Sequence, residues 1–206
     1  MLILAGLGNP GPKHEHNRHN IGFMAADAIA ERWRFSGWRA KFQGQAAEGQ
    51  IDTPAGPIRA VLLKPQTFMN DSGQAVGAVL RFHKATPADV VVFYDELDLA
   101  PGRFRMKTGG GEAGHNGLRS ISAHIGRDYR RARLGIGHPG HKDRVLGHVL
   151  SDFHKVEHSW VRALCAACAE AAPLLAAGED ERYQTEVMRL APAEKLDTRA
   201  ANRDGV

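Results

Sequence analysis

The stretch that decides the fold reads LILAGLGNPG and runs from Leu2 to Gly11. An apolar run that ends in glycine and proline predicts a buried strand followed by a tight turn. Comparable runs bounded by turn residues predict further strands. These are Arg59–Leu63, Val90–Tyr94, Arg103–Lys107 and Arg133–Ile136, with a weaker one near Ala46–Ile51.

Helical patterns fall between these runs. Apolar residues at helical spacing predict a helix over Ile21–Trp33, a second one capped by Asp71 or Ser72, and a short one over Leu118–Ile125. A long C-terminal helix is expected from Phe153 to about Ala177, with a kink at Pro173 and an apolar stripe of Val156, Trp160, Leu164, Cys168 and Ala172. Strands that alternate with helices indicate an α/β fold, with a twisted mixed sheet flanked by helices.

Length and composition favour one domain. The chain has 206 residues, of which 43% are hydrophobic, and we expect one domain over residues 1–190 and a flexible tail over 191–206. No apolar run approaches the length of a membrane helix, and the N-terminus lacks the basic region of a signal peptide, so we expect a cytoplasmic protein. The single C-x-x-C, Cys165 and Cys168, lies in an apolar helical run and predicts core residues. No coiled coil or long apolar edge is evident, which favours a monomer.

The charge is unevenly distributed. The chain carries a net charge of +4, yet residues 103–144 contain ten Lys and Arg against three acids. A localised positive segment in an otherwise nearly neutral protein suggests a polyanionic partner such as a nucleic acid. A solvated basic surface is the alternative.

The turn Gly6–Gly11 also matches G-x-G-x-x-G, a pattern found in dinucleotide-binding proteins. Two prolines and a polar run follow it, so no helix N-terminus stands behind the glycines to receive a pyrophosphate. No acid ends a second strand, because Asp27 falls inside the first predicted helix. We therefore expect no nucleotide cofactor, although a nucleotide-dependent oxidoreductase stays an alternative. We expect the glycines instead to let the backbone turn sharply and bring Asn9 to a cleft.

The polar run HEHNRHN, residues 14–20, holds three histidines. It nearly matches the zinc-binding H-E-x-x-H, but Arg18 occupies the last position. A zinc hydrolase that uses His14, His16 and His19 remains an alternative. His19 stands directly before an apolar helix, where packing could hold it as a base.

Two other predicted strands end in polar residues. KPQTFMN, residues 64–70, precedes a helix, so Asn70 could contact a ligand or cap that helix, and Phe68 and Met69 could be core or a shelf for a substrate. Tyr94-Asp95-Glu96-Leu97-Asp98 places acids where one could orient a histidine base, or where all could lie in a solvated loop.

Two glycine-rich loops follow. KTGGGEAGHNGL, residues 107–118, has five glycines in nine residues, and Lys107 beside exposed amides could grip a phosphate. The loop after the predicted strand Arg133–Ile136, which includes residues 137–141, could move over a cleft as a lid.

Together and in this order, these segments resemble the bacterial-type peptidyl-tRNA hydrolase family. The resemblance rests on GLGNPG, RHNIGF, KPQTFMNDSG, DELDLAPG, KTGGGEAGHNGLRSI and RARLGIGHPG, and it covers about residues 6–149. It implies a metal-free esterase, without cofactor, that cuts the ester joining a peptide to tRNA. A non-catalytic RNA-binding relative of the same fold is the alternative.

The resemblance also implies roles for individual residues. His19 would be the general base and Asp95 its orienting carboxylate. Asn9, Asn70 and Asn116 would bind the peptide main chain, the water and the oxyanion, in an assignment left open. Met69, with Phe68 beside it, would line the peptide channel, and Lys107 and Arg133 would hold tRNA phosphates. The sequence departs from the family at His14, Asn17, Tyr94 and Glu112-Ala113, and His14, in place of a usual tyrosine, puts one substrate contact in doubt.

Overall fold

A seven-stranded mixed sheet forms the centre of the protein, which we describe over residues 1–193 of a computed structural model. The strand order is β2-β3-β4-β1-β5-β7-β6, and β4, β1, β5 and β7 all run parallel. The other three strands run antiparallel to their neighbours. The strands are β1 (Leu2–Gly6), β2 (Arg39–Lys41), β3 (Gly44–Thr53), β4 (Gly56–Pro65), β5 (Val90–Glu96), β6 (Phe104–Thr108) and β7 (Arg130–Gly135).

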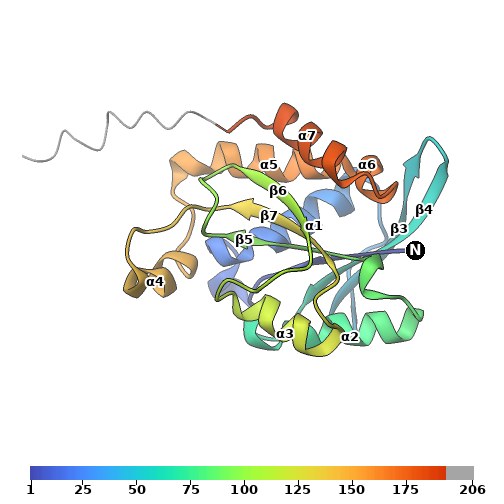
Figure 1. Cartoon of the computed structure of the whole chain (residues 1–206), viewed down its shortest axis with the longest axis horizontal. Helices are drawn as coiled ribbons and strands as arrows, with labels where there is room; N and C mark the ends of the chain where they lie inside the picture. Colours follow the sequence, from blue (N-terminus) through green and yellow to red (C-terminus); the bar gives the residue numbers. More distant parts are fainter. Residues whose placement is uncertain (194–206) are drawn as a thin grey trace, which may run out of the picture.

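Helices cover both faces of the sheet (Figure 1). On one face lie α1 (Ile21–Arg32), α5 (His158–Glu170), α6 (Ala172–Ala176) and α7 (Asp180–Leu190). On the other lie α2 (Ser72–His83) and α3 (Asn116–Ile125). The short helix α4 (Val145–Val149) lies apart from both layers at one end of the molecule.

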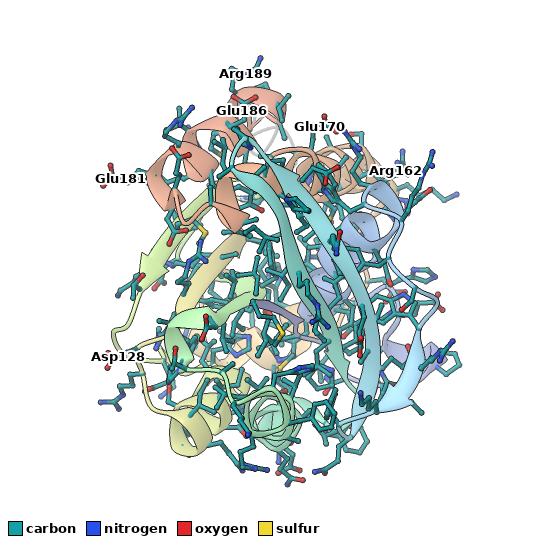
Figure 2. The ribbon with its side chains drawn as sticks, turned by 90° about the vertical axis from the view of Figure 1, so that its right-hand side faces the viewer. Asp128, Arg162, Glu170, Glu181, Glu186 and Arg189 are labelled. Atoms are coloured by element: carbon teal, nitrogen blue, oxygen red, sulfur yellow. The ribbon has the colours of Figure 1, made fainter. Side chains whose placement is uncertain are left out.

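The core consists of one apolar layer on each face of the sheet. Within β1, Leu4 belongs to the layer under α1 and α5, and Ile3 to the layer under α2 and α3. Central parallel strands are buried on both faces, which explains why β1 and β5 read as continuous apolar runs. Charged side chains project outward from the covering helices, as Figure 2 shows for Glu170 on α5 and Glu186 on α7.

Most predicted elements are present, but the C-terminal helix differs from the expectation. It begins at His158 and not at Phe153, and Val156, expected on its buried stripe, is 83% exposed. Pro173 lies in the first turn of a separate helix, α6, because proline is tolerated there but not within a continuing helix. The sequence also did not predict β2, α4 or α7. Asn70 does not cap α2; the N-cap position is held by Asp71, without a side-chain hydrogen bond.

The C-terminal part of the described chain packs into the apolar layer that also contains residues of α1 and α5. Tyr183 and Val187 of α7 are fully buried, and Ala191, the first residue of the expected flexible tail, is also buried. The rest of that predicted tail, residues 194–206, lies outside the described residues. Within residues 1–193 no helix is long and apolar enough to cross a membrane.

The topology brings the chemical motifs to one edge of the sheet. Because β1, β4 and β5 are parallel, their carboxyl ends meet there. The segments after β1 and β4 carry Asn9 and Met69, and β5 itself ends in Asp95 and Glu96. Open α/β sheets bind ligands at this edge.

Candidate active site

Asp95 connects two histidines from distant parts of the chain. His19 Nδ1 lies 2.8 Å from both carboxylate oxygens of Asp95, and His115 Nε2 lies 3.0 Å from Oδ1. The Asp95 side chain is 1% exposed, whereas the side chains of His19 and His115 are 13% and 9% exposed. The rings of His19 and His115 are tilted by 48° to each other, with centroids 5.0 Å apart. The predicted pairing of His19 with Asp95 is present in the structure, together with a second histidine that the sequence did not single out.

Hydrogen bonding fixes the tautomer of both rings. The backbone N–H of Leu118 donates to His115 Nδ1 at 3.3 Å, so Nδ1 is an acceptor and the proton of the neutral ring sits on Nε2. This Nε2–H of His115 donates to Asp95 Oδ1. An ionised carboxylate only accepts, so His19 also donates from Nδ1. The lone pair of His19 Nε2 is then free to accept a proton.

The same contacts set the charge states. Burial on its own would lower the pKa of His19, but the charge of Asp95 and its hydrogen bond outweigh burial and raise that pKa above 6.5. Burial would raise the pKa of Asp95, yet His19 and His115 hold it well below its usual range. Asp95 is therefore a carboxylate throughout the physiological pH range.

The turn that carries His19 is anchored from the C-terminal part of the chain. Arg18 is 4% exposed, and its guanidinium donates to Ser151 Oγ at 2.7 Å, to the Asp152 carbonyl at 2.8 Å and to Glu157 at 2.5 Å. Asn17 Nδ2 donates to Asp152 Oδ1 at 2.8 Å. These bonds fix the 3-10 turn that presents His19. Sequence reasoning treated Arg18 only as the residue that breaks a zinc motif.

Asn9 is the most firmly held of the three predicted asparagines. Its backbone N–H donates to Asn20 Oδ1, and Asn20 Nδ2 donates back to its carbonyl, both at 2.9 Å. Its side-chain Oδ1 accepts from the Met69 backbone N–H at 2.8 Å. The amide is thereby oriented, and its Nδ2 group has no acceptor within residues 1–193.

Met69, the residue expected to line the peptide channel, lies between Asn9 and α3. Met69 is buried, and a Cβ at Gly117 would come within 2.6 Å of its sulfur, so the glycine allows α3 to approach Met69 closely. Asn116, the first residue of α3, is solvent-exposed and lines a cleft with His19 and Asp95. Phe68 is 61% exposed and Asn70 is also exposed, so these two side chains are not part of the packed core.

That cleft has a volume of about 470 Å³. The glycine loop lines one side, and the other side is lined by His138 of the expected lid loop together with Val145 and Val149 of α4. A wider hollow of about 680 Å³ lies between α1 and α5 and is lined by Asn9 and Asn20. His14 lines neither hollow; its Nδ1 lies 2.9 Å from Asn17 Oδ1.

The two residues expected to bind tRNA phosphate, Lys107 and Arg133, differ in whether they are paired with an acid within residues 1–193. Lys107 is exposed on β6. Arg133 donates from Nε to Glu96 at 3.0 Å, and Tyr94 donates to the same carboxylate oxygen at 3.2 Å. Burial would lower the pKa of Arg133, but Glu96 outweighs burial and raises it. Two other basic residues of the segment are likewise engaged internally, because Arg130 pairs with an acid and Arg131 is buried.

Within residues 1–193, one group of side chains has the donor spacing of a metal site. The ligand atoms of His19, Asp95 and His115 lie within 4.8 Å of one another. The set anticipated for zinc, His14, His16 and His19, is not brought together among the described residues. The hydrogen bonds between both imidazoles and Asp95 account for the observed cluster without an ion.

The sequence of this chain matches a known protein family and many of its members. Residues 3–195 match the family described as peptidyl-tRNA hydrolase. The chain belongs to the peptidyl-tRNA hydrolase family. A peptidyl-tRNA hydrolase of Phenylobacterium zucineum is 67% identical over 199 residues, covering 97% of this chain and 95% of that protein. One from Caulobacter vibrioides is 60% identical over 99% of this chain and its own full length.

Solved structures give the same family. The crystal structure of peptidyl-tRNA hydrolase from Acinetobacter baumannii superposes with a TM-score of 0.86 at 37% identity, covering 94% of this chain and 97% of that one. The single-domain α/β fold with a mixed sheet is thus the fold of peptidyl-tRNA hydrolases, and the family resemblance in the sequence is confirmed.

Proposed function

We propose that the protein hydrolyses the ester between the peptide, or an N-blocked amino acid, and tRNA in peptidyl-tRNA, which recycles tRNA from aborted translation. The observation that carries this proposal is the contact of His19 Nδ1 with Asp95, which leaves Nε2 free to act as a base. Membership of the peptidyl-tRNA hydrolase family supports the substrate class.

The reaction needs a water, a base and a polarising donor. His19 Nε2 takes a proton from a water as its oxygen attacks the ester carbonyl. Asp95 stabilises the imidazolium that forms, as a buried carboxylate does in other histidine hydrolases. The tetrahedral intermediate collapses, the bond to the ribose oxygen breaks, and His19 returns its proton to that leaving oxygen. No metal or cofactor takes part in these steps.

Asn9 is our candidate for the oxyanion donor. Its Oδ1 is occupied by the Met69 N–H, so Nδ2 is the group it can offer to a developing negative charge. A rigid donor costs no reorganisation in the transition state, and Asn9 is 7% exposed and held on both backbone groups. The exposed amides of Asn70 and Asn116 would bind the peptide main chain.

The remaining predicted residues would contact the two ends of the substrate. Phe68, which is 61% exposed, and Met69 beside Asn9 would line a peptide channel, and His14 would be a further substrate contact. Lys107 and Arg133 lie on the same face of β6 and β7, since Lys107 stands opposite Arg131 and Arg133 is two residues along. Lys107 stands opposite Arg131 of β7, and Asp95 stands opposite Leu134. These positions are three residues apart, so Lys107 lies about 10 Å from Asp95 along the strand direction. A phosphate held there would belong to a neighbouring nucleotide and not to the reacting one.

Selectivity against free aminoacyl-tRNA would arise from the asparagine amides. An N-acylated substrate offers an N–H to an amide oxygen, whereas a free ammonium must lose its hydration to enter. Comparison of kcat/KM for N-acetyl-aminoacyl-tRNA and aminoacyl-tRNA checks this, and equal values would exclude it.

The first experiment measures release of N-acetyl-amino acid from N-acetyl-aminoacyl-tRNA, with and without EDTA. We expect wild-type turnover to be unaffected by EDTA, and His19→Ala to lose about 10²- to 10⁴-fold in kcat. His16→Ala is the matched control, since His16 lies in the same polar run, is exposed and does not contact Asp95. Loss of activity in His16→Ala or in EDTA would favour a zinc enzyme instead.

A non-catalytic RNA-binding relative is the second candidate. It would bind tRNA without turnover by the wild type, and the mechanism above would then be wrong. The joint presence of His19, Asp95 and Asn9 in hydrogen-bonded positions favours the enzyme. We expect the enzyme to act as a monomer in the cytoplasm, and light scattering of the purified protein would test the monomer.

A further inference from the structure

Arg131 on β7 is a cation in the interior of the protein. It is 1% exposed and is the largest of the fully buried side chains. No carboxylate pairs with it within residues 1–193, although its neighbours Arg130 and Arg133 on the same strand pair with Asp180 and Glu96. A guanidinium does not lose its proton in a protein, so this charge is buried without a counter-charge.

The guanidinium is held instead by a loop. Its Nη1 donates to the Gly111 carbonyl at 2.6 Å and its Nη2 to the Gly110 carbonyl at 2.9 Å. Its Cζ lies over the Tyr129 ring, 4.6 Å from the centroid. The two carbonyls belong to adjacent residues, so the fork of an arginine holds a short piece of backbone in one orientation.

That piece of backbone needs support. The antiparallel strand β6 ends at Thr108, opposite Arg130 at the start of β7. Asp95 lies at the other end of the strands, opposite Leu134 near the end of β7. Residues 109–115 must therefore return across the face of β7 to bring His115 to Asp95. Gly110 has a φ of +92°, and Ala113 a φ of +46°, so the path is not one that hydrogen-bonded secondary structure would impose.

The rest of the loop has few other attachments. The Gly109 N–H donates to the Tyr129 carbonyl at 3.2 Å, at the start of the loop. Glu112 pairs with Arg127, whose side chain is 65% exposed and therefore screened by solvent. Arg131 is the buried attachment that lies between the end of β6 and His115.

We propose that Arg131 is a positioning residue for the ester hydrolysis, acting through the Gly110–Gly111 backbone to hold His115 and the start of α3 against Asp95. The inference rests on the proposed function for its kinetic effect, but the contact of His115 with Asp95 can be observed without turnover. A cation with no acid partner is costly to bury, and its two carbonyl contacts are what the structure shows it doing there.

The test compares Arg131→Lys and Arg131→Met with Arg130→Lys. Lysine keeps the charge but lacks the fork, and methionine keeps much of the volume without charge or donors. Arg130 lies on the same strand but contacts Asp180 and the Leu175 carbonyl, so it is the matched control. We expect both Arg131 variants to lose kcat by up to about 10-fold with little change in KM, because a misplaced His115 cannot cost more than the loss of its hydrogen bond to Asp95. Arg130→Lys should keep kcat.

A double-mutant cycle separates positioning from general support of the fold. In a His115→Ala background, Arg131→Lys should cause little further loss of kcat, since the group it positions is already gone. Equal losses in both backgrounds would overturn the proposal.

A readout independent of activity is the downfield proton NMR resonance of His115 Nε2–H. We expect it to broaden or shift in Arg131→Lys while the His19 Nδ1–H resonance persists. An unchanged His115 resonance would also overturn the proposal. If the wild type had no esterase activity, the proposed function would be wrong. The NMR spectrum would still show whether Arg131 holds His115 against Asp95.

Discussion

The Nδ1 atom of His19 lies at the same distance, 2.8 Å, from both carboxylate oxygens of Asp95. A symmetric contact of this kind leaves the imidazole little freedom to rotate, and it directs Nε2 away from the carboxylate. One of those oxygens also accepts from His115. The buried carboxylate therefore fixes the base and is itself fixed by a second ring, and the predictions below follow from this arrangement.

The pH dependence of hydrolysis should report His19. Because Asp95 raises the pKa of His19 above 6.5, we expect kcat/KM to rise with pH through a value above 6.5 as the neutral base forms. In Asp95→Asn the carboxylate charge is lost while burial remains, so the rising limb should move to lower pH and kcat should fall by about 10²- to 10⁴-fold. A pH profile of both proteins checks this; an unmoved limb in Asp95→Asn would contradict it.

The same shift has a consequence for stability. A histidine whose pKa is higher in the folded than in the unfolded protein stabilises the fold fully below the unfolded value, and this contribution disappears as pH rises through the folded value. Wild type should thus lose a part of its stability between pH 6.5 and the raised pKa of His19, and His19→Ala should not. Chemical denaturation at several pH values measures the difference, and parallel curves for the two proteins would exclude it.

Replacement of His115 should reduce catalysis less than replacement of His19. His115→Ala removes one donor to Asp95 but leaves the base and its own contact, so we expect kcat to fall by about 10-fold, in line with the loss of a hydrogen bond to a charged group. Single-turnover kinetics on N-acetyl-aminoacyl-tRNA would measure it. A loss as large as that of His19→Ala would instead give His115 a direct part in the chemistry.

The orientation of Asn9 predicts the effect of a charge at that position. Asn9→Asp keeps the shape but removes both N–H donors and adds a negative charge beside the developing oxyanion, so kcat should fall by about 10²- to 10³-fold. Gln50→Glu, an equivalent change at an exposed position of β3, is the control. Full activity of Asn9→Asp would move the oxyanion site to another asparagine.

Lys107 should contribute to tRNA binding in a salt-dependent manner. Lys107→Ala should weaken binding of tRNA and reduce the slope of log K against log salt concentration by about one phosphate contact. Arg59→Ala, which removes an exposed cation from β4 in the part of the sheet far from β6, should leave the slope unchanged. Filter binding or fluorescence titration at several salt concentrations compares the three proteins, and identical slopes would contradict a phosphate contact.

Added zinc should inhibit the enzyme. Zn²⁺ accepts imidazole and carboxylate ligands, and the spacing of His19, Asp95 and His115 suits it. Binding there would occupy His19 Nδ1 and displace the hydrogen bond that orients the base. We expect micromolar Zn²⁺ to inhibit wild type reversibly and His115→Ala less strongly. Stimulation by zinc would contradict a metal-free mechanism.

The sequence predicted the α/β fold, the central strands of its mixed sheet and the segments that reach the site. Runs such as Val90–Tyr94 are apolar because both faces of the strand are buried, and this pattern is readable without a structure. The C-terminal helices were less readable. Val156 fits a helical stripe by spacing, but it lies before α5 and is exposed, because spacing alone does not show where a helix begins.

Within the site, the sequence pointed to His19, Asp95 and Asn9 through their places after strands or before a helix. It did not point to His115 or Arg131. His115 is recognisable only by its hydrogen bonds, to Asp95 on one side and to the N-terminus of α3 on the other. Arg131 contributed to a count of basic residues that suggested a surface, whereas the fold places it inside. Composition counts charges but does not say which of them are solvated.

The anchoring of Arg18 links the start of the chain to its end. Its guanidinium bonds Ser151, Asp152 and Glu157, more than 130 residues later, and the next residue is the base. These contacts form only after α4 and the segment leading into α5 have been synthesised and docked. A chain still emerging from the ribosome can pair β1, β4 and β5 and yet leave His19 unsupported. The enzyme would thus gain activity late in its own folding, and hydrolysis would serve as a sensitive reporter of whether the C-terminal layer is in place.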